Sequence, residues 1–209
     1  MAHSIILLPL IGFLISCSLS FFKSNKFIDR AAEIITSLFI TITAIFSFYI
    51  FIDNIGDPSV VSIKLFNWIS SGSFNADWSI YLDTATRVML VVITSVSALV
   101  HIYSIGYMSH DDSKPRFMGY LSLFTFAMLM LVTADNFLQL FFGWEGVGLA
   151  SYLLIGFWYK KPTANAAAIK AFIVNRIGDF GLALGIFTIF IVFGSIEYQT
   201  VFSLSLIHI

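Results

Sequence analysis

Apolar residues dominate six long segments of the chain, and polar residues gather in the connections between them. A helix needs roughly 20 predominantly apolar residues to cross a membrane, and each segment approaches or exceeds that length. The predicted spanning helices are Ser4–Phe22, Ala31–Ile52, Thr84–Gly106, Phe117–Thr133, Asn136–Phe157 and Ala166–Phe193. The pattern therefore predicts an all-α polytopic membrane protein, whose first two helices are plain packing elements that face lipid.

A different pattern fills the one long connection, residues 53–83. Apolar and polar residues alternate over Val61–Trp68, and a second candidate strand, Phe74–Tyr81, follows the turn Ser70-Ser71-Gly72-Ser73. Alternation on both sides of a Gly/Ser turn predicts a β-hairpin. The hairpin contains three aromatic residues that suit the headgroup region of a membrane, Trp68, Trp78 and Tyr81. We interpret the hairpin as an interfacial cap without chemistry.

Basic residues in the connections predict the orientation. Seven of them follow the first, third and fifth predicted helices: Lys23, Lys26, Arg30, Lys114, Arg116, Lys160 and Lys161. The opposite connections offer Lys64, with Arg87 just inside the third predicted helix. Cytoplasmic loops of membrane proteins carry an excess of Lys and Arg. The amino terminus is therefore expected outside, and the basic loops in the cytoplasm or the mitochondrial matrix.

Composition excludes several classes of function. With 58% hydrophobic and 11% charged residues and a mean hydropathy of +0.92, the chain is too apolar for one soluble core. The balance of 11 Lys and Arg against 12 Asp and Glu leaves no basic surface for nucleic acid. The single cysteine, Cys17, cannot form an intrachain disulfide, a zinc site or an iron–sulfur site. No cofactor or metal is expected in this chain, so redox chemistry would belong to another chain.

Glu145 lies near the middle of the fifth predicted helix. A carboxylate at the bilayer centre costs several kcal/mol, so it is kept where it meets a partner, a proton or an aqueous path. Glu145 is therefore the first candidate for a functional residue. Gly143, Gly146 and Gly148 surround it inside the helix, which favours close helix packing over a nucleotide-binding loop.

The sixth predicted helix holds a second group of polar residues. Arg176 and Asp179 are spaced i and i+3, share a face with Asn175 and can pair locally. Lys170 lies on the opposite face near the cytoplasmic end, where it is either a topology anchor or part of a proton path. At 1.5 Å per residue, Glu145 lies about 14 Å from the outer end and Asp179 about 20 Å from the inner end. Both approach the midplane.

Two carboxylates beside a guanidinium are suitable parts for proton transfer, because each acid can be protonated or ionised as its partner moves. The alternative is a structural ion pair that locks two helices together. His101, late in the third predicted helix, is a weaker candidate: it can relay a proton, but a hydrogen-bonded helix-end histidine is more common.

The residues around these candidates resemble a known family. Gly143-Trp144-Glu145-Gly146-Val147-Gly148-Leu149 and Asn175-Arg176-Ile177-Gly178-Asp179 are similar to the antiporter-like subunit of proton-pumping NADH:quinone oxidoreductase, respiratory complex I. It is called subunit 5 in mitochondria and subunit L in bacteria. The resemblance implies that Glu145 is the intramembrane glutamate of the amino-terminal half-channel, with Arg176 and Asp179 as neighbours. It also implies that the lysine paired with Glu145 lies on the next helix.

The resemblance implies a non-redox translocase subunit in the inner membrane of a bacterium or mitochondrion. It would contact other membrane-arm subunits and the lipid bilayer, while NADH, flavin, iron–sulfur clusters and quinone would bind to other subunits. Two alternatives stay open: a sodium/proton antiporter subunit of the related cation/proton antiporter family, and a purely structural membrane subunit.

The last residues do not fit the family. The run Leu204-Ser205-Leu206-Ile207-His208-Ile209 equals the translation of a common transposon-adapter sequence, and the family's subunit is much longer. We therefore expect residues 1–203 to be the amino-terminal transmembrane portion of that subunit. Residues 204–209 are expected to be an artefact of library preparation.

Overall fold

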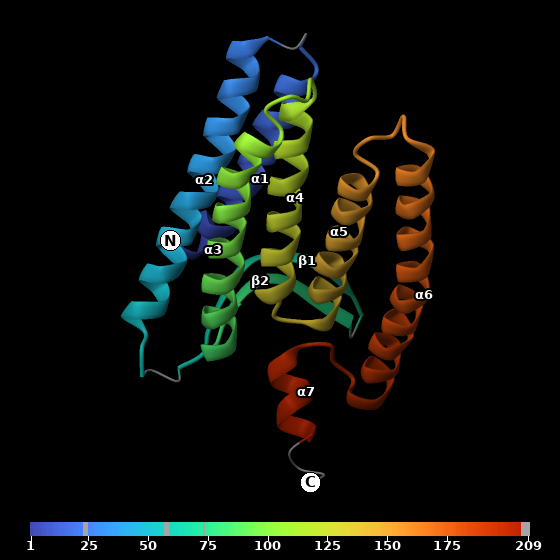
Figure 1. The fold of residues 1–209 in the computed structure, drawn as a ribbon. Coiled ribbons are helices and arrows are strands. Elements are labelled where there is room, and N and C mark those ends of the chain that lie inside the picture. The colour runs from blue at the N-terminus through green and yellow to red at the C-terminus, as the bar shows by residue number, and fades with distance from the viewer. Residues whose placement is uncertain (23–24, 57–58, 73, 206–209) are drawn as a thin grey trace.

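The computed structural model describes residues 1–22, 25–56, 59–72 and 74–205 (Figure 1). Six of its helices are long and apolar enough to cross a membrane. They are α1 (Ala2–Ser20), α2 (Lys26–Asp53), α3 (Thr84–Tyr107), α4 (Lys114–Val132), α5 (Phe137–Ile155) and α6 (Pro162–Phe193). The all-α polytopic prediction, with six spanning helices, is confirmed.

Four helices, α1, α2, α4 and α6, begin earlier than hydropathy predicted, and the difference is largest for α2 and α6. α2 begins at Lys26, because the side chain of Asn25 accepts a hydrogen bond from the backbone N–H of Phe27 and caps the helix. α6 begins at Pro162, a residue that suits the first helical position because it has no N–H to satisfy. Lys26, Asp29 and Arg30 therefore lie on α2, whereas Lys160 and Lys161 precede α6.

A short helix, α7 (Tyr198–Ser205), follows α6 (Figure 1). The hydropathy pattern did not predict it, because 8 residues are too few for a span. Residues 206–209 of the predicted artefact lie outside the described residues, so the assignment of 204–209 stays a prediction.

The predicted hairpin is confirmed. Strands β1 (Val61–Ser71) and β2 (Phe74–Leu82) form an antiparallel sheet in which Val61 pairs with Leu82 and Ser71 with Phe74. Gly72, next to the turn, has φ 58°, which glycine reaches without steric cost. The first strand is largely exposed, whereas Ala76, Ile80 and Leu82 of the second are buried.

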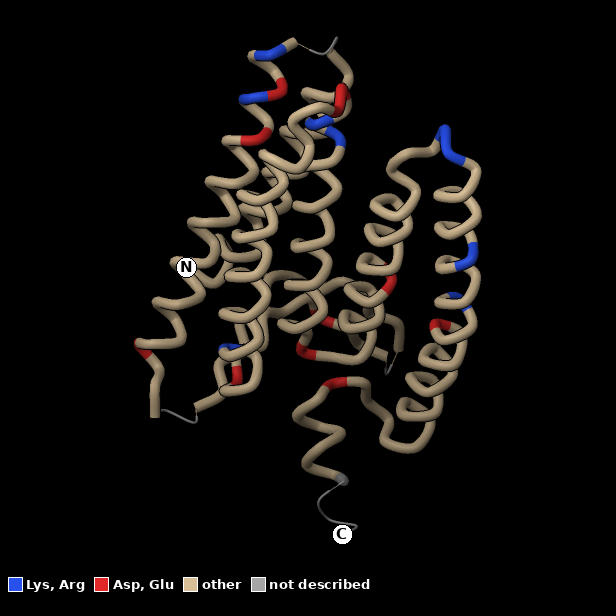
Figure 2. Tube along the Cα trace, viewed as in Figure 1, with Lys and Arg blue, Asp and Glu red and all other residues tan. Residues whose placement is uncertain are grey.

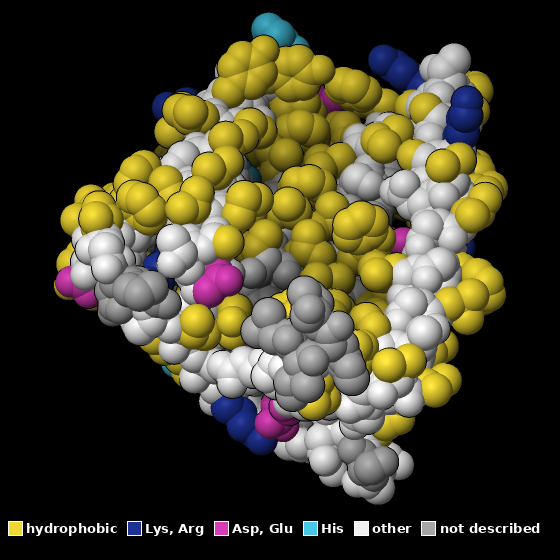
Figure 3. All heavy atoms as spheres, turned by 90° about the horizontal axis from the view of Figure 1, so that it is seen from below, with side chains coloured by type: hydrophobic (Ala, Val, Ile, Leu, Met, Phe, Trp, Pro, Cys, Tyr) yellow, Lys and Arg dark blue, Asp and Glu magenta, His cyan; other side chains and the backbone are white. Residues whose placement is uncertain are grey.

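Helices α1–α4 form a bundle, and α5 joins it to α6 (Figure 1). The connections α1–α2, α3–α4 and α5–α6 lie at one end, where Lys and Arg gather (Figure 2). We call this end the basic face and the opposite end, where the hairpin lies, the hairpin face. Figure 3 looks onto the hairpin face and shows hydrophobic side chains over much of it, with a few charged side chains between them. Large apolar side chains are also exposed along the spanning helices, for example Leu99, Ile177 and Ile191.

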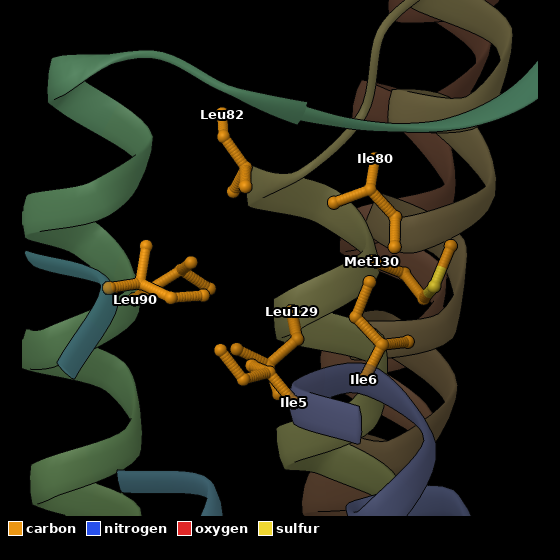
Figure 4. Packing of buried hydrophobic residues seen from close by; sticks show 8 residues of the cluster. Ile5, Ile6, Ile80, Leu82, Leu90, Leu129 and Met130 are labelled. Atoms are coloured by element: carbon orange, nitrogen blue, oxygen red, sulfur yellow. The ribbon is translucent and has the colours of Figure 1, made fainter. Parts of the chain in front are cut away.

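Under the hairpin the bundle is closed by an apolar cluster (Figure 4). Eight buried residues from α1–α4 and β2 form it: Ile5, Ile6, Ile50, Ile80, Leu82, Leu90, Leu129 and Met130. The hairpin therefore covers the end of the bundle with its own apolar side chains and is fixed to it by packing.

The prediction that the first two helices are plain lipid-facing elements is wrong. Polar residues of α1 and α2 are buried against the other helices: Ser16, Glu33, Thr36, Ser37, Thr43 and Ser47. Small hydroxyl residues scarcely lower the mean hydropathy of a long helix. An average over the whole segment therefore did not reveal these buried polar residues. In α2 the residues Glu33, Thr36, Ser37 and Ile40 recur at helical spacing and mark the face turned to the bundle.

Candidate ion-pair site between two membrane helices

Glu145 and Asp179 lie near the middle of their helices. Asn136 begins α5 by accepting a hydrogen bond from the backbone N–H of Gln139 at 2.8 Å. From the observed bounds, Glu145 lies about 12 Å along the axis from the start of α5 and about 15 Å from its end. Asp179 lies about 21 Å from the carboxyl end of α6 and about 25 Å from its start. Both carboxyl groups are far from the helix ends, as predicted.

Arg176 joins the two carboxyl groups. Its Nη1 donates to Oε1 and Oε2 of Glu145, each at 2.6 Å, and lies 3.6 Å from Oδ2 of Asp179. The sequence predicted the local pair with Asp179, and the structure contains it. The closer contact, however, crosses from α6 to α5. The structure thus brings together Glu145, Arg176 and Asp179 from two helices.

Trp144 completes this group, and sequence reasoning missed it. Its indole Nε1 donates to Oδ1 of Asp179 at 2.8 Å, so the two carboxylate oxygens of Asp179 face donors from different helices. The guanidinium of Arg176 also lies 4.8 Å from the ring centre of Phe172, within range of a cation–π contact. In the sequence, the signal that could have pointed to Trp144 was its position next to Glu145.

The members of the site differ in exposure. The Asp179 side chain is 9% exposed, that of Glu145 27% and that of Arg176 50%. A cavity of about 320 Å³ between α4, α5 and α6 is lined by Trp144, Val147, Asn175 and Asp179 among others. The group is therefore partly open, and its charges can change partners without unpacking a core.

Lys170 does not belong to this group. It is exposed on α6 and forms no ion pair or hydrogen bond with the described part of the chain. Its position agrees with the opposite helix face predicted from the sequence, and its role in a proton path stays a prediction. Among the described residues, no group of three or more His, Cys, Asp or Glu has the arrangement of a metal site.

Close packing of α4 on α5 fixes Glu145 relative to the bundle. A Cβ atom at Gly143 would lie 2.5 Å from the backbone nitrogen of Leu131, and one at Gly146 would lie 3.0 Å from Cβ of Ala127. Glycine at these positions lets the helices approach, as predicted. A Cβ at Gly148 would meet no atom of the described residues within 4 Å, so within this part of the chain the packing interpretation does not hold for that glycine.

Two family models match the chain. Residues 68–118 match the model described as NADH-ubiquinone oxidoreductase (complex I), chain 5 N-terminus. Residues 134–208 match the model described as NADH:quinone oxidoreductase/Mrp antiporter, TM, a range that includes the whole ion-pair group. The chain belongs to this family of antiporter-like complex I subunits.

Relatives in the family are similar over most of the chain. NADH-quinone oxidoreductase subunit L of Rickettsia felis is 57% identical over 179 residues, which are 85% of this chain and 28% of the relative. NADH-ubiquinone oxidoreductase chain 5 of Chondrus crispus is 52% identical over 200 residues, 96% of this chain and 29% of the relative. The chain therefore spans less than a third of the length of these relatives.

Solved structures share the fold. The Mrp complex from Dietzia sp. DQ12-45-1b aligns over 94% of this chain and 20% of that chain, with a TM-score of 0.74 and 22% identity. The membrane-bound sulfane sulfur reductase, an archaeal respiratory membrane complex, aligns over 96% of this chain and 39% of that chain, with a TM-score of 0.79 and 16% identity. At these identities the likeness concerns the arrangement of the helices.

In this member of the family the hairpin also holds α5. The side-chain amide of Gln139 donates to the carbonyl of Ser79 at 2.7 Å and accepts from its N–H at 3.1 Å. Asn136 donates to the carbonyl of Asp77 at 2.7 Å. A hydrogen bond from Lys64 holds the pKa of Asp77 below its usual value of 3.8, and burial opposes this effect. The hairpin is therefore a positioning element for the helix that carries Glu145.

Proposed function

We propose that the chain is part of a proton-translocating, non-redox membrane subunit of NADH:quinone oxidoreductase. The observation that carries this proposal is the Glu145–Arg176–Asp179 group at mid-membrane depth, in a chain whose relatives are named as subunits of that enzyme. NADH oxidation and quinone reduction, with their flavin and iron–sulfur clusters, are assigned to other subunits, and the neighbours in the membrane are other membrane-arm subunits and lipid.

The geometry suggests how a proton changes the pairing. Ionised Glu145 holds Arg176 through two hydrogen bonds, and a proton arriving on Glu145 removes the negative charge that holds the guanidinium. Arg176 keeps its own charge, since a guanidinium does not deprotonate in proteins. It then needs only a small movement to pair fully with Asp179, which lies 3.6 Å away. The guanidinium thus couples the protonation of one carboxyl to the pairing of the other.

Orientation is part of the proposal. From the excess of Lys and Arg at the basic face we infer that this face lies inside and the amino terminus outside, in the inner membrane of a bacterium or a mitochondrion. A cysteine at Ser71, on the hairpin, should react with an impermeant maleimide from outside, and one at Ser113 should not. The reverse pattern would overturn the orientation.

The test of function is Glu145→Gln in the complete subunit assembled in its complex. Glutamine keeps the size of the side chain but cannot take or release a proton. We expect normal assembly and a strong loss of proton uptake per NADH oxidised in reconstituted vesicles, with part of the activity retained in Glu145→Asp. Wild-type coupling in the glutamine variant would leave Glu145 with a structural role.

The sodium/proton antiporter alternative predicts a different cargo. If the proposed function is right, the same vesicles should show NADH-driven proton uptake that does not depend on sodium, and they should take up no radioactive sodium. Sodium uptake that disappears in Glu145→Gln would favour the antiporter reading. The relatives that are more than 50% identical are named as oxidoreductase subunits, which favours the proton.

A further inference from the structure

A second set of buried polar groups lies inside the α1–α4 bundle. It contains His101, which is 1% exposed, and Glu33, which is 4% exposed. Both lie on membrane-spanning helices, where an ionisable side chain is costly and is by default a candidate for function. Neither takes part in the mechanism proposed for Glu145.

His101 has hydrogen-bond partners on both ring nitrogens. Nδ1 lies 2.8 Å from the carbonyl oxygen of Ser97, and Nε2 lies 3.2 Å from the hydroxyl of Ser122. A carbonyl only accepts, so Nδ1 carries a proton and Nε2 accepts from Ser122 when the ring is neutral. The Ser122 hydroxyl can rotate and accept instead. The ring can therefore take a proton on Nε2 and keep both partners.

Small residues lead from Ser122 toward the basic face. A Cβ atom at Gly12 would lie 3.6 Å from the Ser122 hydroxyl, and one at Gly119 would lie 3.6 Å from Cβ of Ser16. Ser16 is fully buried and donates to the carbonyl of Pro115 at 2.6 Å. Pro115 in turn lines a cavity of about 320 Å³ at the basic face. Glycines and hydroxyls thus line a seam between α1 and α4.

A partly buried ion pair lies at the basic-face end of the same bundle. Oε1 of Glu33 is 3.7 Å from Nζ of Lys114. Within the described ranges, neither that oxygen nor the hydroxyl of Ser37, one turn further along α2, has a hydrogen-bond partner. Buried polar atoms without partners point to a water, a proton or an ion that satisfies them. Because Glu33 and Ser37 share one face of α2, both unsatisfied atoms belong to the same part of the bundle.

Toward the hairpin face the polar groups around His101 continue for one turn among the described residues: Ser97 Oγ lies 3.4 Å from Nδ1 of His101 and 2.5 Å from Oγ1 of Thr125. Buried hydroxyls nearer that face, of Thr43, Ser47 and Thr94, donate to carbonyls of their own helices. Beyond them the apolar cluster beneath the hairpin closes the bundle (Figure 4). The polar seam is therefore one-sided.

We propose that His101 is a second proton-accepting site, reached from the basic face through the seam of Ser16 and Ser122 and closed toward the hairpin face. The ring takes a proton from the aqueous phase on Nε2 and returns one to the same phase, so no co-reactant is needed. The charged groups around this half of the bundle include Asp29 and Glu33 of α2, Asp112 of the α3–α4 connection, and Lys114 and Arg116 of α4. The proposal does not rest on the function assigned to Glu145.

Access can be tested with silver ions, which are small and bind thiols. In a cysteine-free background, Ser122→Cys is compared with Thr94→Cys in the complete subunit assembled in native membranes, since both serine and threonine are 0% exposed. Silver is added on one side, and the thiols that remain are then alkylated after unfolding. Silver on the basic-face side should block alkylation of Ser122→Cys and leave Thr94→Cys fully labelled. Full labelling of Ser122→Cys, or equal blocking of both, would overturn the path.

Proton access can be tested separately on the imidazole. In the complete subunit, labelled with ¹⁵N-histidine and placed in lipid bilayers, the signal of His101 is identified by its loss in His101→Gln. After transfer to heavy water, its ring N–H should exchange much faster than the backbone N–H of Leu129 in the apolar cluster. Equal protection of the two groups would show that His101 is a sealed structural residue and would contradict the proposal.

Discussion

The α1–α4 bundle and the α5–α6 pair place polar groups in the membrane in different ways. Between 22% and 44% of the residues in the spanning windows of α1–α4 are buried, against 17% in α5 and 11% in α6. In the bundle, hydroxyls and an imidazole are surrounded by helices and bond to backbone groups and to one another. In the pair, charges satisfy each other on helices that are mostly exposed.

This difference suggests a division of work. A buried network such as that of His101 gains stability from fixed partners and loses it when any one partner is removed. The Arg176 group has one cation between two carboxyls, so a change of protonation can redistribute its contacts with little repacking. The bundle and its hairpin hold α5, and the α5–α6 pair carries the charges that can rearrange.

The largest effect is expected where the bundle grips α5. Gly143→Ala places a Cβ atom 2.5 Å from the backbone of α4 and must push the helices apart. Overpacking of this kind costs about 1–3 kcal/mol and sometimes more. The amount of assembled complex on native gels should fall sharply. Gly148→Ala is the matched control, because its Cβ meets no atom of the described residues within 4 Å, and it should assemble normally. Equal assembly of both variants would show that the contact is dispensable.

Arg176 is expected to give the next largest effect, on proton pumping. Arg176→Ala leaves the carboxylates of Glu145 and Asp179 without their shared cation, whereas Arg176→Lys keeps the charge and loses the planar fork. Proton uptake per NADH should fall in both variants and further in the alanine variant. If both variants assemble and pump equally well, the shared guanidinium is a bystander.

Trp144 should have a smaller effect through Asp179. Trp144→Phe keeps an aromatic ring and removes the indole N–H that donates to Asp179. A hydrogen bond to a carboxylate is worth about 1.5–3 kcal/mol when buried, and less at this half-exposed site. A several-fold loss of pumping rate is expected, with normal assembly. Trp158→Phe, which removes the indole bond to Asp111 in the connections at the basic face, is the control and should pump as the wild type does. Identical rates in the two variants would remove Trp144 from the site.

The smallest effect concerns the hairpin and pH. Because Lys64 lowers the pKa of Asp77 below 3.8, this pair stabilises the folded state at pH values above that figure, and the contribution is lost as the pH falls through the folded pKa. The difference in unfolding temperature between wild type and Lys64→Met should therefore be present near neutral pH and shrink on acidification. Lys160→Met, at the basic face, should show no such dependence. A difference that grows in acid would contradict the assigned cause.

The fold could largely be predicted from the sequence, because its elements follow from local patterns. Hydropathy over about 20 residues locates a spanning helix, and alternation with a Gly/Ser turn locates the hairpin. The short helix α7 has no such pattern. Glu145, Arg176 and Asp179 were found because charge inside an apolar segment is improbable.

Partners across helices could not be predicted in the same way. Whether Arg176 turns to Asp179 or to Glu145, and whether Trp144 reaches Asp179, depends on the rotation and spacing of two helices, which glycine contacts such as that of Gly143 with α4 help to set. Glu33 was missed for another reason. It lies near the end of the predicted helix, where a carboxyl group is expected to face solvent. Packing against α4 buries it beside Lys114, and this contact is not visible in the sequence.

The central claim is that the carboxyl of Glu145 changes its protonation during turnover. Infrared difference spectra of the assembled complex, recorded between the resting state and NADH-driven turnover, observe protonated carboxyl groups directly. The wild type should show a change in a protonated carboxyl C=O band that is absent in Glu145→Gln, shifted in Glu145→Asp and retained in Glu33→Gln. An unchanged band in Glu145→Gln would contradict the claim and leave the Glu145–Arg176 pair as a structural link between α5 and α6.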